Sequence, residues 1–302
     1  MALSAKDKSI HCKGWDPDRE KCIAADRAKV FQSVSKNLKD ALKDAVLVLV
    51  TLPPQAFREV LDEMNAAGMR STMLVNLSAR HAAPGAWIES AFGAHAPYVS
   101  MLPALNPASL DESTEERLEA RADLFKGGRI YISASPRAPE GALNLAVDLA
   151  VLLGGQPVFA EAGEVDGLAA ANRLLPELAV SALMSAVSSQ PSWRDGQMLA
   201  GAALAWAGVP LDDLTAAEWA QIALADSQNS LRVLDDLGGV LRRMRQALLD
   251  NDQAALEDIL SDSQSARADW LERRRKGLAA GQLASSVPSE KDALQKFLQL
   301  GQ

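Results

Sequence analysis

Histidine and cysteine are scarce in this chain of 302 residues, which contains three of the first and two of the second. Metal sites and disulfide frameworks are built from clusters of these residues at short spacings. The five residues do not form such a pattern: they are Cys12, Cys22, His11, His81 and His95. The sequence therefore predicts neither a metal site nor a disulfide framework, and a reducing, cytoplasmic location fits.

Long apolar runs and an excess of positive charge are also missing. No run reaches the roughly 18 apolar residues that cross a bilayer, and the first residues lack the apolar segment of a signal peptide. The net charge of −8 disfavours nucleic acid as a partner, because contacts to phosphates depend on clustered Lys and Arg. The one dense basic run, at 272–277, ends a predicted helix, where cations interact favourably with the helix dipole. We expect neither a nucleic-acid nor a membrane partner.

The first half of the chain alternates short apolar runs with amphipathic stretches. "AVLVLVTLP" at 45–53 is a continuous apolar run that ends at a proline, as expected of a buried parallel strand. Further strands are predicted at 71–78, 96–102 and 128–134, and helices at 18–28, 36–43, 55–67, 84–92 and 113–125. This alternation predicts a parallel sheet covered by helices on both faces.

After about residue 160 the pattern changes to long segments rich in Ala and Leu, and no segment there is typical of a strand. Helices are predicted at 164–189, 192–207, 215–249, 252–276 and 289–299, with breaks where Pro, Gly or Asp-Asn-Asp interrupt the pattern. The length allows two domains. We predict an α/β domain over residues 1–160 and an all-helical domain over residues 161–302.

The stretch "SIHCKGWDPDREKC" at 9–22 contains a short extended run that ends in an acid, Asp16, and is followed by a helix start. In a doubly wound nucleotide-binding fold, the acid after the second strand accepts hydrogen bonds from the adenosine ribose and disfavours a 2′-phosphate. This would favour NAD over NADP. Alternatively, "DPD" is a turn and a helix cap, for which Asp and Pro are preferred. Both interpretations remain open.

Three longer stretches carry a resemblance to a known family: "NLKDALKDAVLVLVTLPPQAFREVL", "ARADLFKGGRIYISASPRAPEGALNLAVDLAVLLGG" and "EWAQIALADSQNSLRVLDDL". Together they resemble the prephenate and arogenate dehydrogenases, NAD(P)-dependent enzymes of tyrosine biosynthesis, from about residue 9 to 273. The resemblance implies a Rossmann-like domain and a helical dimerisation domain like that of 6-phosphogluconate dehydrogenase. It also implies a homodimer formed by residues 161–302, a small-molecule ligand between the domains, and cofactor contacts from Asp16, Pro53 and Ser78.

The resemblance further implies that one element is missing. Members of the family begin with a strand and a G-x-G-x-x-G turn, whose backbone N–H groups hold the pyrophosphate. Here "MALSAKDKS" resembles the end of the helix that follows that turn. The expected sheet is therefore an incomplete Rossmann-like sheet without its first strand and glycine loop. Either the start codon has been assigned late, or the element that binds dinucleotide phosphates has been lost.

The positions that match the family's catalytic motifs carry different residues. Leu102 and Pro103 match a His-Pro pair whose histidine takes the substrate hydroxyl proton, and Val165 matches a second histidine. Arg173–Pro176 matches a Ser-His-Leu-Pro motif, so a third histidine is absent, and the family's Thr-Arg-Ile-Ala motif has no counterpart. A loop of the type Asp-x-x-Ser survives approximately at residues 76–78. The substrate therefore cannot be identified from these positions.

Three residues are weak candidates for a catalytic role. Ser78 and His81 follow a predicted strand close to the expected cofactor edge, and His95 precedes the strand that carries Leu102. A lone histidine is more often structural than catalytic, and this alternative applies to both histidines. Arg173 is a weak candidate for binding an anionic ligand. It could equally form an ion pair with Glu177, four residues along the same helix.

Two functions therefore remain. The first is a prephenate dehydrogenase-like, NAD(P)-dependent oxidoreductase, with cofactor binding expected to be weak or absent. The second is a non-catalytic, dimeric relative that binds a small molecule or acts as a scaffold and has lost dinucleotide binding. A third, weaker resemblance is that of "SMLPALNPAS" to pyrroline-5-carboxylate reductases. The sequence alone does not decide among them.

Overall fold

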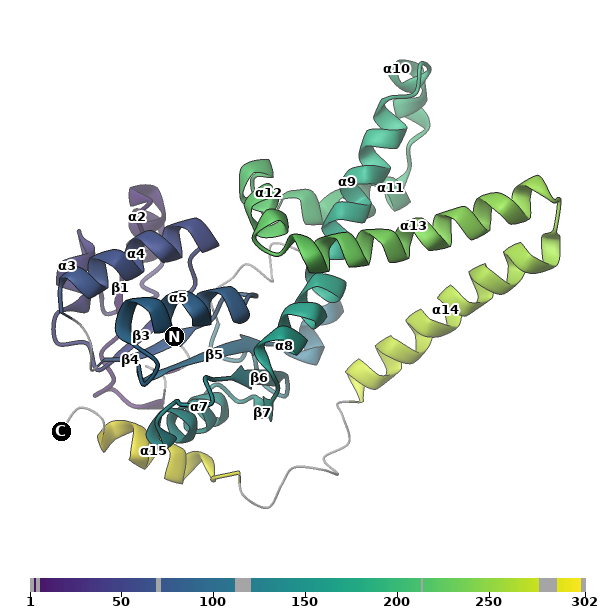
Figure 1. The fold of residues 1–302 in the computed structure, drawn as a ribbon. Coiled ribbons are helices and arrows are strands. Elements are labelled where there is room, and N and C mark those ends of the chain that lie inside the picture. The colour runs from purple at the N-terminus through teal and green to yellow at the C-terminus, as the bar shows by residue number, and fades with distance from the viewer. Residues whose placement is uncertain are drawn as a thin grey trace. The chain divides into compact units, whose positions relative to one another are not determined.

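The computed structural model describes residues 3, 6–68, 72–111, 121–212, 214–276 and 287–299. Contacts divide the chain into two compact units, which we call unit 1 (Met1–Val165 with Arg275–Gln302) and unit 2 (Asp166–Arg274). Strands and helices alternate in unit 1, whereas unit 2 consists of helices (Figure 1). This order confirms the predicted fold class, a Rossmann-like sheet followed by a helical region.

A five-stranded sheet forms the centre of unit 1. Its strands follow the chain order β3 (Leu47–Val50), β4 (Met73–Asn76), β5 (Tyr98–Pro103), β6 (Arg129–Ser133) and β7 (Gln156–Phe159). Strands β3, β4 and β5 are parallel to one another, and β7 is parallel to β6. Strand β6 runs antiparallel to β5, with Leu102 opposite Tyr131.

The antiparallel strand β6 corrects the expectation of a wholly parallel sheet. Parallel neighbours need a crossover connection, usually a helix, whereas antiparallel neighbours do not. The predicted helix at 113–125 lies mostly outside the described residues, and residues 122–127 form turns instead. The chain therefore enters β6 from the end of the sheet at which β5 finishes.

Two very short strands form a second sheet. Strand β1 (Lys13–Gly14) pairs in parallel with β2 (Ser33–Val34), and α2 (Arg19–Arg27) connects them. In the described part of the chain β1 belongs to this small sheet, and β3 is an edge strand of the larger one. The Rossmann-like sheet is thus divided, with an open edge on β3.

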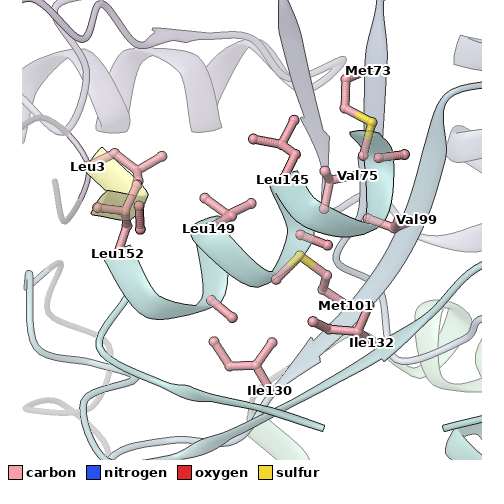
Figure 2. Close-up of a cluster of buried hydrophobic side chains, with 14 of the residues drawn as sticks. Leu3, Met73, Val75, Val99, Met101, Ile130, Ile132, Leu145, Leu149 and Leu152 are labelled. Carbon is pink, nitrogen blue, oxygen red and sulfur yellow. The ribbon is translucent and has the colours of Figure 1, made fainter. Parts of the chain in front are cut away.

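The two faces of the larger sheet are covered by different helices. Side chains alternate between the faces of a strand, so Val75, Val99 and Ile132 lie on the face covered by α7 (Glu140–Leu152). Figure 2 shows Leu145, Leu149 and Leu152 of α7 packed over this face. Leu74 and Tyr98 lie on the other face, in a buried cluster with side chains of three helices. These helices are α3 (Leu38–Leu42), α4 (Pro54–Ala66) and α5 (Ala82–Phe92).

The last helix, α15 (Glu290–Gln299), belongs to unit 1 and packs against α7 (Figure 1). We had expected it in a helical domain over residues 161–302, and the structure corrects this boundary. Ala293 is buried, and Leu294, Phe297 and Leu298 pack against the cluster shown in Figure 2. At the start of the helix, Lys6 Nζ lies 2.7 Å from Glu290 Oε1.

Among the described residues of unit 2, helices are joined by short turns and no strand occurs. A long helix crosses the boundary between the units as α8 (Ala162–Ala169), continues through a π turn (η2, Ala170–Leu174) and ends as α9 (Leu175–Ser188). The other helices are α10 (Trp193–Gly196), α11 (Ala202–Gly208), α12 (Ala216–Ala225), α13 (Ser227–Leu249) and α14 (Gln253–Arg275). Single-turn 3₁₀ segments lie at Pro107–Asp111 in unit 1 and at Gln197–Leu199 and Val209–Asp212. No described helix combines the length and the apolar character needed to cross a bilayer.

The predicted helices at 192–207 and 215–249 are each interrupted. The first breaks around Gly201, between α10 and α11. The second breaks at Asp226, whose backbone is not helical (φ −142°, ψ 66°) and whose side chain accepts a hydrogen bond from the Asn229 N–H. A side chain that caps the start of one helix in this way offers the backbone an alternative to helical hydrogen bonds, and so favours the end of the helix before it. The helical pattern was correct. A side-chain hydrogen bond accompanies the break at Asp226, whereas Gly201 precedes α11 without one.

Candidate functional site

The carboxyl ends of the parallel strands define the candidate site. Pro53 lies three residues after β3, Ser78 two residues after β4, and Leu102 is the second-last residue of β5. Asp16 follows β1 of the smaller sheet by two residues. Ligands of open α/β sheets bind beyond the carboxyl ends of the strands. The structure thus brings Pro53, Ser78 and Leu102 to one edge of the larger sheet and places Asp16 at the corresponding end of β1.

Asp16 is part of a turn. Its Oδ1 accepts a hydrogen bond from the Asp18 N–H at 2.8 Å, and the Asp18 side chain caps α2 by accepting one from the Glu20 N–H. The interpretation of "DPD" as a turn and helix cap is therefore confirmed. A carboxylate has two oxygens and about four acceptor positions, so the turn does not prevent a ribose contact through Oδ2. The cofactor role of Asp16 stays a prediction.

A network of hydrogen bonds shapes the turn after β4. The side-chain amide of Asn76, which is fully buried, donates to the Arg80 carbonyl oxygen (2.7 Å) and to Ser100 Oγ (3.0 Å). Asn76 Oδ1 accepts from the Ser78 N–H, and Ser78 Oγ donates to the same Arg80 oxygen at 2.9 Å. Buried polar groups are stable only when hydrogen-bonded. Asn76 and Ser78 thus hold the turn at the edge of the sheet, and the Ser78 oxygen can still accept a bond.

His81 precedes α5 and is only 1% exposed. Its Nδ1 lies 2.6 Å from Ser133 Oγ on β6. Burial lowers the pKa of His81 to about 4, because the charged imidazolium loses its hydration in the interior. The ring is therefore neutral near pH 7, and the contact ties the turn after β4 to β6. This geometry favours a structural role, and a catalytic role of His81 stays a prediction.

His95 lies far from Leu102 in space. It is exposed in the loop before β5, at the amino end of that strand. A strand rises about 3.3 Å per residue, so the part of β5 from Tyr98 to Leu102 alone spans roughly 13 Å between the loop of His95 and Leu102. The structure does not bring His95 to the carboxyl edge, because the short distance in sequence spans the strand from one end to the other.

Leu102, which the sequence resemblance matches to the family's catalytic histidine, is the second-last residue of β5. It is 8% exposed and shares a sheet face with Ser100, two residues earlier. A hydrocarbon side chain cannot accept a proton. Val165, which matches a second histidine, is fully buried as well. Both positions carry an apolar, buried side chain.

The sequence analysis missed a pair of serines in the strands. Ser100 of β5 and Ser133 of β6 lie opposite each other, and both are buried. Ser100 binds Asn76, and Ser133 contacts His81. Apart from a tyrosine, each serine is the one residue of its strand with a hydroxyl group. A lone serine in a mostly apolar strand could have indicated a buried hydrogen bond. The pairing of the two serines could not be read from the sequence because it depends on the antiparallel register.

Arg173 lies in unit 2, on the exposed side of the π turn. In that turn the Leu175 N–H donates to the Ala170 carbonyl oxygen, five residues earlier. Pro176 follows, and a proline has no N–H with which to continue the regular pattern. A π turn often marks a functional position, but here the proline gives a local cause. Binding of an anionic ligand by Arg173 stays a prediction.

No group of three or more metal-ligating side chains occurs among the described residues.

The fold is that of the prephenate and arogenate dehydrogenases. The crystal structure of prephenate dehydrogenase from Aquifex aeolicus, in complex with hydroxyphenyl propionate and NAD⁺, is similar with a TM-score of 0.74 and 14% sequence identity. The similarity covers 89% of this chain and 93% of that chain. Synechocystis arogenate dehydrogenase is similar with a TM-score of 0.67 and 13% identity, over 89% of this chain and 94% of that one. No protein-family model and no curated protein matches the sequence.

Proposed function

We propose that the chain is an NAD(P)-dependent oxidoreductase of the prephenate and arogenate dehydrogenase type. The observation that carries the proposal is the similarity to the Aquifex aeolicus enzyme, with a TM-score of 0.74 over 89% of this chain. The positions of Asp16, Pro53 and Ser78 after the carboxyl ends of strands support it, because a dinucleotide binds along that edge. The substrate class is an acid whose hydroxyl-bearing carbon gives up a hydride.

The residues present fit one half of the cofactor better than the other. Asp16 can accept a hydrogen bond from a ribose hydroxyl, and Pro53 and Ser78 can line the nicotinamide side. The 302 residues contain no G-x-G sequence, so the usual cradle for the pyrophosphate is not among them. A bound NAD(P)⁺ would supply the hydride acceptor. The proton would need an acceptor, and Leu102 cannot be one.

A second candidate function is a non-catalytic relative that keeps the scaffold. The buried apolar side chains of Leu102 and Val165 favour it. General-base assistance typically contributes about 10²–10⁴ in rate, so an enzyme that lost its base would retain little turnover. Both candidate functions share the fold, and they differ in whether NAD(P)H forms.

We also propose that unit 2 forms a homodimer within residues 161–302. Unit 2 has few buried apolar residues, whereas many large apolar side chains on its helices are exposed, with Leu199 at 89%. The other strongly exposed ones are Met198, Trp206, Leu224, Leu231, Leu241, Leu248, Leu249 and Trp270. Large exposed apolar surfaces often mark sites of protein–protein contact. A second copy would bury it.

Calorimetric titration of the chain with NAD(H) and NADP(H) tests the cofactor proposal. Loss of two or three charge-assisted hydrogen bonds of about 1.5–3 kcal/mol each weakens binding by roughly three to six orders of magnitude. We expect a Kd above about 1 mM and a preference for NAD(H), since Asp16 disfavours a 2′-phosphate. Asp16→Asn should reduce that preference, and the exposed control Asp26→Asn should not. A micromolar Kd would show that another segment holds the pyrophosphate.

A further inference from the structure

Helix α13 carries two apolar stripes, and only one is covered within unit 2. The first stripe contains Val233 and Ala247, which are buried, and Leu237, Val240 and Met244, which are half-buried. Helix α13 packs against α9, the π turn and α12. The second stripe consists of Leu231, Leu234, Gly238, Leu241, Arg245 and Leu248. Its four leucines are 61%, 39%, 56% and 66% exposed, in chain order.

The spacing of the second stripe is that of a helix pair. Its members recur at intervals of three and four residues, which is the heptad pattern of positions that face a second helix. The stripe extends along most of α13, a helix of 23 residues. Apolar residues at such spacing normally lie against a partner helix. In the part of the chain that the structure describes, these leucines remain exposed.

Gly238 lies in the middle of the stripe. A glycine inside a helix costs about 1 kcal/mol relative to alanine. A Cβ at this position would meet, within 4 Å, only Arg242 Nη1 at 3.4 Å among the described residues. That atom is the end of a flexible side chain, so it does not require a glycine. Close approach of another backbone does require one.

The charges beside the stripe are distributed in two halves. Arg232, Asp235 and Asp236 lie in the first half of α13, where Arg232 Nη1 lies 3.7 Å from Asp236 Oδ2, and Arg242, Arg243 and Arg245 lie in the second half. The first half therefore carries a net negative charge and the second half a positive one. Two copies of α13 in parallel would place like charges side by side. In an antiparallel pair, the acidic half of each helix faces the basic half of the other. The helix is therefore complementary to a second copy of itself.

We propose that the exposed stripe of α13 is the seam of an antiparallel, two-fold pairing with α13 of a second copy of this chain. The helices cross near Gly238, which packs against Leu241 of the partner subunit. Leu231 then packs against Leu248 of the partner subunit, and Asp235 lies near Arg242 of the partner subunit. The inference rests on the proposed homodimer and specifies which helix face forms it.

Cross-linking tests the orientation of the pair. The background is Cys12→Ser with Cys22→Ser, and a short bismaleimide is added to Leu231→Cys, Leu248→Cys and the double variant. In the antiparallel pair, position 231 lies beside position 248 of the other copy, whereas equal positions are about 25 Å apart. We expect the double variant to form cross-linked dimers and each single variant to remain uncross-linked. Efficient cross-linking of the single variants would overturn the antiparallel arrangement.

Charge reversal and an apolar-to-acidic substitution test the seam itself, with mass measured by light scattering. Leu241→Glu should give monomers, whereas Leu105→Glu, an exposed leucine in unit 1, should not. Asp235→Arg and Arg242→Asp should each raise the dimer Kd by roughly tenfold, and the double variant should restore it. Circular dichroism confirms that each variant is folded. If Leu241→Glu remains dimeric and the Leu231→Cys, Leu248→Cys double variant does not cross-link, the α13 pairing is wrong, although the homodimer itself can still be correct. A monomeric native chain at micromolar concentration would overturn the proposed homodimer as well.

Discussion

Burial determines the chemistry that single residues at the carboxyl edge can perform. His81 is neutral because its pKa is lowered to about 4 by loss of hydration, and its Nδ1 contacts Ser133. Asn76 Oδ1 accepts a hydrogen bond from the Ser78 N–H, and both side chains donate to the Arg80 carbonyl oxygen. Leu102 offers no polar group at all. The polar residues at this edge therefore hold the backbone in place, and Leu102 at the same edge is apolar.

The pKa of His81 predicts how stability depends on pH. The ordinary pKa is 6.5 and the folded value is about 4, so the unfolded chain binds a proton first as the pH falls. The contribution of His81 is fully present above pH 6.5 and is lost as the pH falls toward 4. We expect the stability difference between the native chain and His81→Gln to shrink by about 2 kcal/mol between pH 7 and pH 5. Urea unfolding at the two pH values measures it.

The exposed residue His95 provides the matched control for that measurement. His95→Gln should leave the pH dependence of the native chain unchanged, because His95 is exposed. A difference between the native chain and His81→Gln that is the same at both pH values would contradict the burial of a neutral ring.

The sequence predicted some residues of the candidate site and not others, for a physical reason. Asp16, Pro53 and Ser78 could be placed because each follows a strand, and the end of a parallel strand can be recognised from its pattern. Ser100 and Ser133 could not be paired, because their contact depends on the direction of β6. Whether His95 approaches Leu102 could not be predicted, because distance along the chain does not tell which end of a strand a loop joins.

At the level of elements, patterns predict helices better than they predict their partners. The spacing of Ala293, Leu294, Phe297 and Leu298 shows that α15 buries one face. It does not show that this face lies against α7, in unit 1. The same holds for the strands, whose alternation with helices was correct while the direction of β6 was not. Sequence periodicity reports that a face is buried, but the covering element is set by packing across the whole unit.

Packing of α15 on α7 predicts a measurable contribution to the stability of unit 1. Phe297 packs against the buried cluster, so Phe297→Ala should lower the free energy of unfolding by about 2 kcal/mol, less than for a fully buried Phe. Lys291→Ala, at an exposed position of the same helix, should change it by less than about 0.5 kcal/mol. Urea unfolding followed by circular dichroism compares the two variants. Equal effects would show that α15 does not stabilise unit 1 in solution.

At the level of the whole molecule, the fold is that of the prephenate and arogenate dehydrogenases. The similarity to the Aquifex aeolicus enzyme covers 89% of this chain at 14% identity. Such a similarity is carried by the pattern of apolar residues, which tolerates exchange among side chains of comparable volume. A proton acceptor has no such tolerance. The fold class could therefore be predicted from the sequence, whereas the substrate could not, because the residues that the sequence resemblance matches to the family's catalytic motifs are different in this chain.

The formation of NADH from prephenate by the native chain and by Leu102→His tests the central claim most directly. The claim is that Leu102 lies at the position of the proton acceptor in a dehydrogenase-type site. With NAD⁺ above the millimolar Kd expected, Leu102→His should raise turnover by at least about 10²-fold, the lower range of general-base assistance. Val46→His, at an exposed position before β3, should give no increase. Native turnover on the order of 10 s⁻¹, or no increase in Leu102→His, would contradict the account.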